Sequence, residues 1–190
     1  MLITPNLIVK EKNKECIYSL YDRLLQDRII YLFGEIDENQ AASITAQLMY
    51  LESVDGEKDI QLYINSSGGS VSAGFAIYDV MCKIKPDIST VCVGACYSMA
   101  AFLLAGGTKG KRYALINSEI MLHQPLSGIS GQASDIEIAS KRIQKVKSRL
   151  NNILALNTNK SIDEILDATD RDNFMFSEDA LSFGLIDRII

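Results

Sequence analysis

Apolar and polar residues alternate along the chain with two periods, one typical of strands and one of helices. Short apolar runs bounded by turn residues predict strands at 28–33, 60–64, 88–93, 111–116 and 119–123. Apolar residues at helical spacing predict helices at 18–25, 38–51, 71–84, 98–105 and 132–156, and shorter ones beginning at Ser161 and Ser177. This alternation indicates an α/β fold with a mostly parallel sheet. Because the strands are almost continuously apolar, we expect both faces of the sheet to be covered.

Two segments stand outside this alternation. Residues 1–18 are mixed in character and predict an irregular or hairpin arm. The helix at 132–156 would be about 37 Å long, which exceeds the radius of gyration of about 16 Å for a domain of this size. It therefore either protrudes and contacts a partner or packs as an ordinary amphipathic helix on its own sheet. Its apolar stripe consists of Ile136, Ala139, Ile143, Val146, Leu150 and Ile153. No repeat or linker interrupts the pattern, so residues 1–190 are predicted to form one domain.

Composition narrows the class of protein. The 190 residues carry 24 acidic and 19 basic side chains, a net charge of −5, which argues against nucleic-acid binding. Four cysteines are too few for a disulfide scaffold at this length, and they are typical of a reducing compartment. The first residues lack the basic region of a secretory signal, and the apolar stretch 91–105 is too short to span a membrane. We therefore expect a cytoplasmic protein that binds neither membranes nor nucleic acid.

Cofactor and metal motifs are not apparent. Residues 106–112 resemble a phosphate-binding loop superficially, but three residues instead of four separate the glycines, and Arg112 stands where serine or threonine would bind magnesium. The single histidine and the lack of a Cys-x-x-Cys pair make a zinc site unexpected. Cys92 and Cys96 are interpreted as core residues. The sequence thus predicts no cofactor and no metal.

Three short segments could carry chemistry. Ser98 stands where a strand is expected to meet a helix, so it is either a helix N-cap or a nucleophile beside free backbone N–H groups. Gly68 and Gly69 follow another strand, where a substrate backbone could approach closely. His123 is the only imidazole that could activate a serine. Spacing alone does not choose the acid that would orient it among Asp163, Asp167, Asp170, Asp172, Asp179 and Asp187.

Several motifs together resemble those of the ClpP family of self-compartmentalised serine peptidases, in the same order and over essentially the whole chain. They are Asn65-Ser-Ser-Gly-Gly-Ser, Cys96-Tyr-Ser-Met, Lys109-Gly-Lys-Arg, Met121-Leu-His-Gln-Pro, Gly131-Gln-Ala-Ser-Asp-Ile-Glu-Ile and Thr169-Asp-Arg-Asp-Asn-Phe-Met. The resemblance implies a catalytic triad of Ser98, His123 and Asp172. It also implies an oxyanion hole formed by the N–H groups of Gly68 and Met99. Extended peptides would pair with Gly69 and with a glycine-rich strand that includes Pro125, Leu126 and Gly128.

The resemblance further implies an assembly and a partner. The fold would be the crotonase-like type, and the 132–156 helix would be a handle between two stacked heptameric rings. Asp170 and Arg171 would form an inter-ring ion pair, and residues 1–20 would form an axial arm. A separate AAA+ ATPase of the Clp type would unfold proteins and feed them in, docking at an apical pocket with Tyr63, Tyr113 and Leu115. For these three residues, burial in the core is the other interpretation.

Some residues depart from the family pattern. Tyr97, Ala100 and Ser127 stand where smaller residues are usual, and they bear on the shape of the substrate pocket. Gln61 and Lys83 replace residues that are often aromatic, and they bear on ATPase docking. The main hypothesis is a serine endopeptidase that forms the core of an ATP-dependent protease. The alternatives are a catalytically silent structural subunit of a mixed barrel and a crotonase-like acyl-CoA enzyme.

Overall fold

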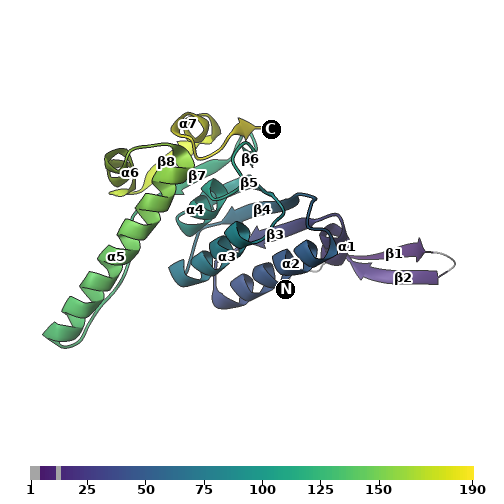
Figure 1. Cartoon of the computed structure of the whole chain (residues 1–190), viewed down its shortest axis with the longest axis horizontal. Coiled ribbons are helices and arrows are strands. Elements are labelled where there is room, and N and C mark those ends of the chain that lie inside the picture. The colour runs from purple at the N-terminus through teal and green to yellow at the C-terminus, as the bar shows by residue number, and fades with distance from the viewer. Residues whose placement is uncertain (1–4, 12–13) are drawn as a thin grey trace.

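The computed structural model describes residues 5–11 and 14–190 as alternating strands and helices (Figure 1). The strands are β1 (Asn6–Glu11), β2 (Lys14–Ser19), β3 (Ile29–Phe33), β4 (Ile60–Ser66), β5 (Ile88–Tyr97), β6 (Arg112–Ala114), β7 (Glu119–Leu122), β8 (Asn173–Phe176) and β9 (Arg188–Ile189). The helices are α1 (Leu20–Gln26), α2 (Glu38–Val54), α3 (Val71–Lys83), α4 (Met99–Ala105), α5 (Ala133–Thr158), α6 (Ile162–Thr169) and α7 (Ser177–Phe183). The mixed α/β class is confirmed, while β8 and β9 were not predicted.

The main sheet is mostly parallel, as the alternation predicted. Its strand order is β3-β4-β5-β6-β9, and every pair along this path is parallel. The first half of β5 pairs with β6, whereas its last residues, Ala95–Tyr97, pair with β7. β8 then pairs antiparallel with β7. β5 is longer than predicted because it serves both halves of the sheet, and it ends at Tyr97, directly before Ser98.

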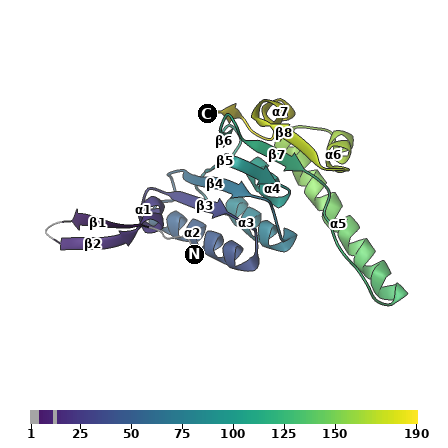
Figure 2. The same cartoon turned by 180° about the vertical axis from the view of Figure 1, so that it is seen from behind.

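Helices cover only one face of β3 and β4. Residues of β4 alternate between buried and half-buried, and β3 repeats this pattern. Figure 1 shows α2 and α3 over one face, and Figure 2 shows no helix over the opposite face of these strands. The expectation that both faces are covered was therefore wrong for this part of the sheet. The buried side chains, among them Leu32, Leu62, Cys92 and Cys96, pack with α4 into one hydrophobic cluster.

The long helix α5 is divided into a packed half and a free half. Its C-terminal half packs against the body through the buried residues Asn151, Leu154 and Thr158. Its N-terminal half extends away, accompanied by the chain segment that precedes it (Figures 1 and 2). Ile136, in that half, is 43% exposed. Only the C-terminal half therefore behaves as an ordinary amphipathic helix on its own core.

A hairpin of β1 and β2 projects from the other end of the molecule (Figure 1). It corresponds to part of the predicted N-terminal arm at 1–20, whose residues 1–4 and 12–13 lie outside the described residues. Within residues 5–11 and 14–190, no helix combines the length and the apolar character needed to cross a membrane.

Candidate active site

The side chains of Ser98, His123 and Asp172 form a line near the carboxyl ends of β5 and β7. The Nε2 atom of His123 lies 2.8 Å from the hydroxyl oxygen of Ser98. The other ring nitrogen, Nδ1, lies 3.0 Å from a carboxylate oxygen of Asp172. The histidine side chain is 16% exposed, and the aspartate side chain is 61% exposed. An imidazole at this distance can take a proton from the hydroxyl, and a carboxylate on its far side can orient it.

The backbone of Ser98 adopts an unusual conformation that presents its hydroxyl. Its φ is 55° and its ψ is −119°, a combination that residues other than glycine rarely adopt. Residues with such strained backbone angles are often found at functional sites. Ser98 occupies the N-cap position of α4, as predicted, but its side chain makes no capping hydrogen bond. The Ser98 N–H donates to the carbonyl oxygen of Met121 at 2.8 Å. This bond joins the turn to β7, the strand that ends just before His123.

Gly68 packs directly against the Ser98 turn. A Cβ atom at this position would lie 2.8 Å from both the Ser98 Cβ and the Tyr97 carbonyl oxygen, so only glycine fits. The Gly68 N–H already donates to the hydroxyl of Ser66 at 3.0 Å. The choice of Gly68 as an oxyanion donor stays a prediction. Within the described part of the chain, the N–H groups of Gly69 and Met99 have no acceptor.

Hydrogen bonds hold the loop that carries Asp172. Lys147 of α5 donates to the Gln124 side chain at 3.0 Å, and Gln124 donates to the Asp170 carbonyl oxygen at 2.7 Å. Arg171 pairs with the carboxylate of Asp170 at 3.3 Å in the same chain, where both side chains are exposed. The two residues predicted as an inter-ring pair therefore contact each other beside the acid. The inter-ring contact itself stays a prediction.

A narrow apolar hollow of about 30 Å³ adjoins Ser98 and His123. It is lined by Val71, Ser98, Met99, Phe102, Leu122, His123, Pro125, Leu150, Asn151 and Leu154. Asn151 was not singled out from the sequence, because on a helix its spacing resembles that of the neighbouring core residues. A second hollow lies between the segment 125–127 and the middle of α5. The site thus has an apolar recess next to the serine hydroxyl.

The segment after His123 differs from its prediction. Residues 123–130 have no strand pairing, so the expected glycine-rich strand is not formed in the single chain. Leu126 is 81% exposed, and a Cβ added to Gly128 would meet no atom within 4 Å. Strand assignment needs a hydrogen-bonded neighbour, and this segment has none. Its unpaired main chain is therefore open to an added strand.

Tyr97 does not line the hollow beside Ser98. Its hydroxyl donates to a carboxylate oxygen of Glu119 at 2.5 Å. This hydrogen bond raises the pKa of Tyr97, so the hydroxyl stays protonated. The ring meets Phe174 edge to face, with centroids 5.7 Å apart. Phe174 lies two residues after Asp172. The ring of Tyr97 therefore connects β5, the strand before Ser98, with the segment that carries Asp172.

The residues predicted to dock an ATPase do not belong to the core. Tyr63 and Tyr113 are half-buried, and Leu115 is 38% exposed. Both tyrosines pair with Val91 in the sheet register, so they lie on the same face. Tyr63 also stacks on Tyr31, with ring centroids 5.6 Å apart. This is the face that carries no helix over β3 and β4.

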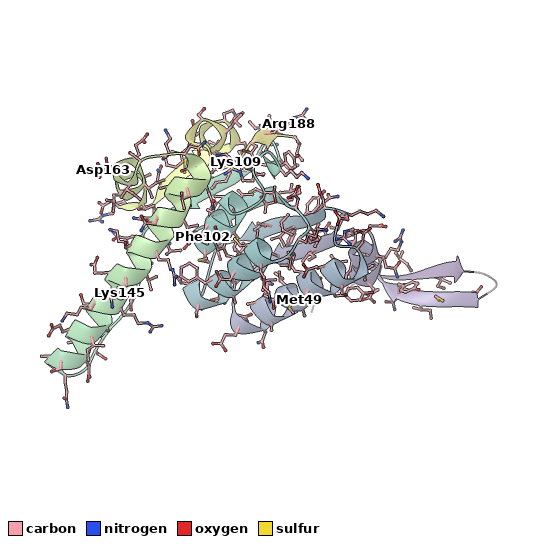
Figure 3. The ribbon with its side chains drawn as sticks, viewed as in Figure 1. Met49, Phe102, Lys109, Lys145, Asp163 and Arg188 are labelled. Carbon is pink, nitrogen blue, oxygen red and sulfur yellow. The ribbon has the colours of Figure 1, made fainter. Side chains whose placement is uncertain are left out.

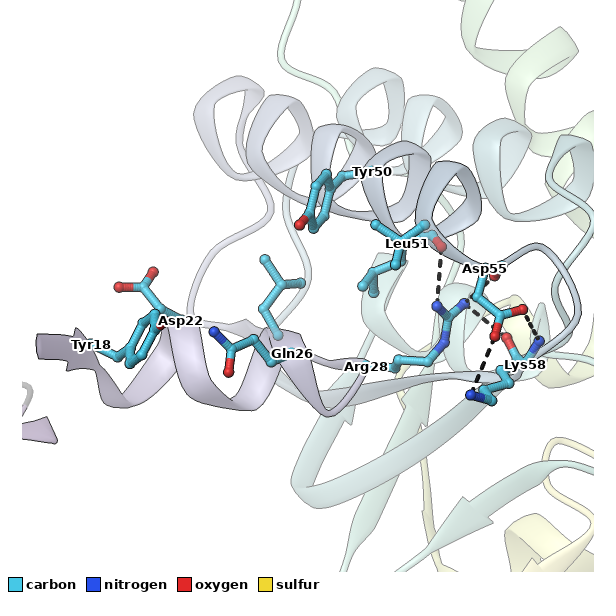
Figure 4. A pocket seen from close by; sticks show the side chains of 10 residues that line it. Tyr18, Asp22, Gln26, Arg28, Tyr50, Leu51, Asp55 and Lys58 are labelled. Atoms are coloured by element: carbon cyan, nitrogen blue, oxygen red, sulfur yellow. Dashed lines mark hydrogen bonds and ion pairs between the residues drawn. The ribbon is translucent and has the colours of Figure 1, made fainter. Parts of the chain in front are cut away.

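Another hollow, of about 640 Å³, lies between α1 and the end of α2 (Figure 4). Arg28 points into it, but its guanidinium donates to the backbone carbonyls of Leu51, Asp55, Lys58 and Asp59. The arginine therefore provides hydrogen-bond donors for the carbonyl oxygens at and after the end of α2, and its guanidinium is not free to bind a ligand. None of the residues around Ser98 lines this hollow.

Fold and site together define an α/β protein in which strand ends align a serine hydroxyl, an imidazole and a carboxylate. The family model described as Clp protease matches residues 12–190. The chain therefore belongs to the Clp protease family. Membership supports a ClpP-type peptidase, and it implies a ClpP-type assembly and partnership with Clp ATPases in general.

Proposed function

We propose that this chain is a serine endopeptidase whose triad is Ser98, His123 and Asp172. The observation that carries the proposal is the pair of distances on either side of His123, 2.8 Å to the Ser98 hydroxyl and 3.0 Å to the Asp172 carboxylate. His123 takes the hydroxyl proton as Ser98 attacks the peptide carbonyl, and it then gives the proton to the leaving amine. Asp172 orients the ring and stabilises its charged form. In the second half of the reaction, His123 takes a proton from a water molecule, which attacks the acyl ester of Ser98. The acid product leaves, and His123 returns the proton to the Ser98 hydroxyl.

The negative charge of the tetrahedral intermediate needs preorganised donors. The N–H groups of Gly68 and Met99 are our candidates, and that of Met99 has no acceptor among the described residues. Gly68 lies directly against the Ser98 turn, where the Cβ of any other residue would clash. The open main chain of 125–128 would pair with an extended peptide on the other side of the site. Pairing through backbone groups is consistent with broad substrate choice.

In the proposed function, the protein is the proteolytic core of a larger ATP-dependent protease complex in the cytoplasm. Its chains would form two stacked heptameric rings of the crotonase-like subunit fold, with α5 as the handle and Asp170 and Arg171 at the ring contact. An AAA+ unfoldase of the Clp type would dock at the face with Tyr63, Tyr113 and Leu115. It would feed unfolded polypeptides to the site, and neither metal nor organic cofactor takes part in the proposed chemistry.

The triad is tested with Ser98→Ala. We expect kcat for a fluorogenic peptide to fall roughly 10⁶-fold, while Ser53→Ala, an exposed serine on α2, keeps wild-type activity. A serine-directed fluorophosphonate should label Ser98 in the wild-type protein, as located by peptide mass spectrometry. Unlabelled Ser98 in an inactive wild-type protein would support the silent structural subunit instead. Binding of coenzyme A in calorimetry, without peptide cleavage, would favour the acyl-CoA enzyme.

A further inference from the structure

The carboxylate of Asp172 has few contacts of its own to hold it in place. Its side chain is 61% exposed. In the part of the chain that the structure describes, His123 is its only hydrogen-bond or ion-pair partner. Its backbone lies in the short segment 170–172, between α6 and β8. An exposed side chain on an irregular segment is displaced easily, so its distance from His123 depends on what holds this segment.

The pairing of β7 with β8 stops just before these two residues. Leu122 of β7 pairs with Asn173 of β8, and the two strands are antiparallel. The next positions outward are therefore His123 on one segment and Asp172 on the other. Among the residues that the structure describes, no backbone hydrogen bond joins the two segments beyond this pair. Contacts that involve side chains therefore keep the segments together at the triad.

Gln124 connects the two segments one residue further out. Its amide nitrogen donates to the carbonyl oxygen of Asp170 at 2.7 Å, and it lies 3.5 Å from the carboxylate of the same residue. The amide belongs to the residue after His123, and the carbonyl belongs to the residue two before Asp172. Arg171 also donates to this carbonyl oxygen, at 2.7 Å, but from within the segment 170–172. The bond from Gln124 is therefore the one that joins the histidine segment to the acid segment.

Lys147 of α5 fixes the orientation of the Gln124 amide. Its ammonium donates to the side-chain oxygen of Gln124 at 3.0 Å. A reversed amide would turn its NH₂ group toward the ammonium and its oxygen toward the Asp170 carbonyl, so neither bond could form. Figure 3 labels Lys145 on α5, and Lys147 follows it by two residues toward the packed half of the helix.

The surroundings of Lys147 give this contact further weight. The lysine is half-buried, and Gln124 is its only hydrogen-bond partner among the described residues. Burying part of an ammonium group without a carboxylate beside it is unfavourable. The neutral amide of Gln124 is the acceptor that the half-buried ammonium has. The position of this lysine is therefore explained by its bond to the amide and not by an ion pair.

We propose that Gln124 and Lys147 are positioning residues for the acid of the triad. Lys147 orients the Gln124 amide, and the amide holds the acid segment at Asp170. The carboxylate of Asp172 then stays within hydrogen-bonding distance of His123. Neither positioning residue takes part in the proposed chemistry, so each acts through Asp172. This inference rests on the proposed function, because the position of Asp172 matters to the reaction only if it belongs to the triad.

The first test uses single variants, each assayed as assembled protein isolated by size-exclusion chromatography. Gln124→Leu removes both hydrogen bonds, and we expect kcat for a fluorogenic peptide to fall about tenfold with KM changed less than about twofold. Lys147→Met should lower kcat about fivefold, whereas Lys147→Arg can still donate and should retain most of the activity. Equal losses in Lys147→Met and Lys147→Arg would contradict the role of this lysine.

The matched control is Lys160→Met. Lys160 lies just beyond the end of α5 and forms an exposed ion pair with Glu164 at 3.0 Å. Exposed pairs of this kind contribute little, so this variant should keep wild-type kcat. A loss of kcat in the control as large as that in Lys147→Met would show that removing any lysine near α5 has this effect, and it would overturn the inference.

The decisive test repeats Gln124→Leu in an Asp172→Ala protein, whose kcat is expected to be roughly 10⁴-fold lower than that of wild type. A residue that acts through Asp172 has little left to influence once the carboxylate is gone. Gln124→Leu should then change kcat by less than about twofold. The rate at which the fluorophosphonate labels Ser98 should follow the same pattern, and this rate does not depend on peptide binding.

The outcomes separate the inference from the proposed function. The same tenfold loss with and without Asp172 would overturn the inference, because Gln124 would then act on something other than the acid, and it would leave the proposed function standing. If the proposed function itself fails, wild-type protein cleaves no peptide and the fluorophosphonate leaves Ser98 unlabelled.

Discussion

At the scale of single residues, Tyr97 shows how a bulky side chain is accommodated next to a strained turn. Successive residues of a strand point to opposite faces, so the tyrosine that precedes Ser98 lies on the far side of the sheet from α4. There it gains one hydrogen bond, to Glu119, and one aromatic contact, to Phe174. The departure from the family pattern therefore does not narrow the recess beside Ser98. It adds a connection between β5 and β8.

We expect Tyr97→Ala to lower kcat for peptide hydrolysis about fivefold, because an edge-to-face aromatic contact contributes about 1 kcal/mol. Losing it would loosen the segment that carries Asp172. Tyr97→Phe keeps the ring and removes only the hydroxyl, so its kcat should stay within about threefold of wild type. Steady-state assays with one fluorogenic peptide check both variants. Equal activity of Tyr97→Ala and wild type would show that the contact between Tyr97 and Phe174 does not influence the position of Asp172.

At the scale of elements, an ion pair explains the glycine-rich and basic segment after α4. Arg112 of β6 is almost fully buried and contacts the carboxylate of Asp187 at 2.5 and 2.8 Å. It also donates to the Asn157 carbonyl oxygen at the end of α5. The Gly110 N–H donates to the same carboxylate at 2.7 Å. This segment therefore joins the sheet edge to α5, and both Arg112 and the Gly110 N–H are engaged within the fold.

The pair predicts a pH dependence of stability. Burial raises the pKa of Asp187, but the charge and hydrogen bonds of Arg112 outweigh it and hold the pKa below its ordinary value of 3.8. A lowered folded-state pKa stabilises the protein above the unfolded-state pKa, and this contribution is lost as pH falls through the folded-state value. We expect Asp187→Asn to reduce the free energy of unfolding by about 2 kcal/mol at pH 7.

Urea unfolding at pH 7 and at pH 3 measures both effects. The loss of stability between these pH values should be smaller in Asp187→Asn than in wild type. The control is Glu137→Gln, which breaks the exposed pair with Lys141 on α5 and should cost less than about 0.5 kcal/mol. Equal losses in the two variants at pH 7 would contradict a special role for the buried pair.

At the scale of the whole molecule, the free half of α5 leaves apolar side chains without contacts. Ile136 and Ile138 are 43% and 67% exposed. The chain segment that precedes α5 runs along the same half of the helix (Figure 2). Exposed apolar stretches of this kind mark interaction sites, because covering them removes apolar surface from water. The family relationship implies a ClpP-type assembly in general. The free half of α5 is where we expect copies of the chain to meet.

Size-exclusion chromatography with light scattering should therefore find a particle far larger than the 21.0 kDa chain, with two heptameric rings corresponding to about 294 kDa. Ile138→Asp should shift the protein to smaller species, since it puts a charge into the covered surface. The matched control is Leu156→Asp, on the packed half of the same helix, where the leucine is 76% exposed. A stable wild-type monomer would contradict the assembly, and an unchanged size for Ile138→Asp would move the contact elsewhere.

The sequence by itself determined most of the helices and the longer strands, because their periodicity is a local property. It also singled out Ser98 and His123, one as a residue at a strand–helix junction and the other as the only imidazole. It could not show β8 and β9, which are short and exist only because β7 and β6 lie beside them. The same holds for β5, whose length follows from pairing with both β6 and β7.

Only the tertiary structure decided questions that depend on what lies next to a residue. Spacing left six aspartates open, the family resemblance pointed to Asp172, and the folded chain places its carboxylate against His123. The close approach of Gly68 to the Ser98 turn, and its hydrogen bond to the Ser66 hydroxyl, likewise appear only in the folded chain. The Nδ2 atom of Asn151 is buried and unpaired among the described residues, and the other residues of α4 and α5 that line the same hollow are apolar. Hydrogen bonds and burial depend on contacts between residues that are far apart in the chain. No local pattern of side chains encodes these contacts.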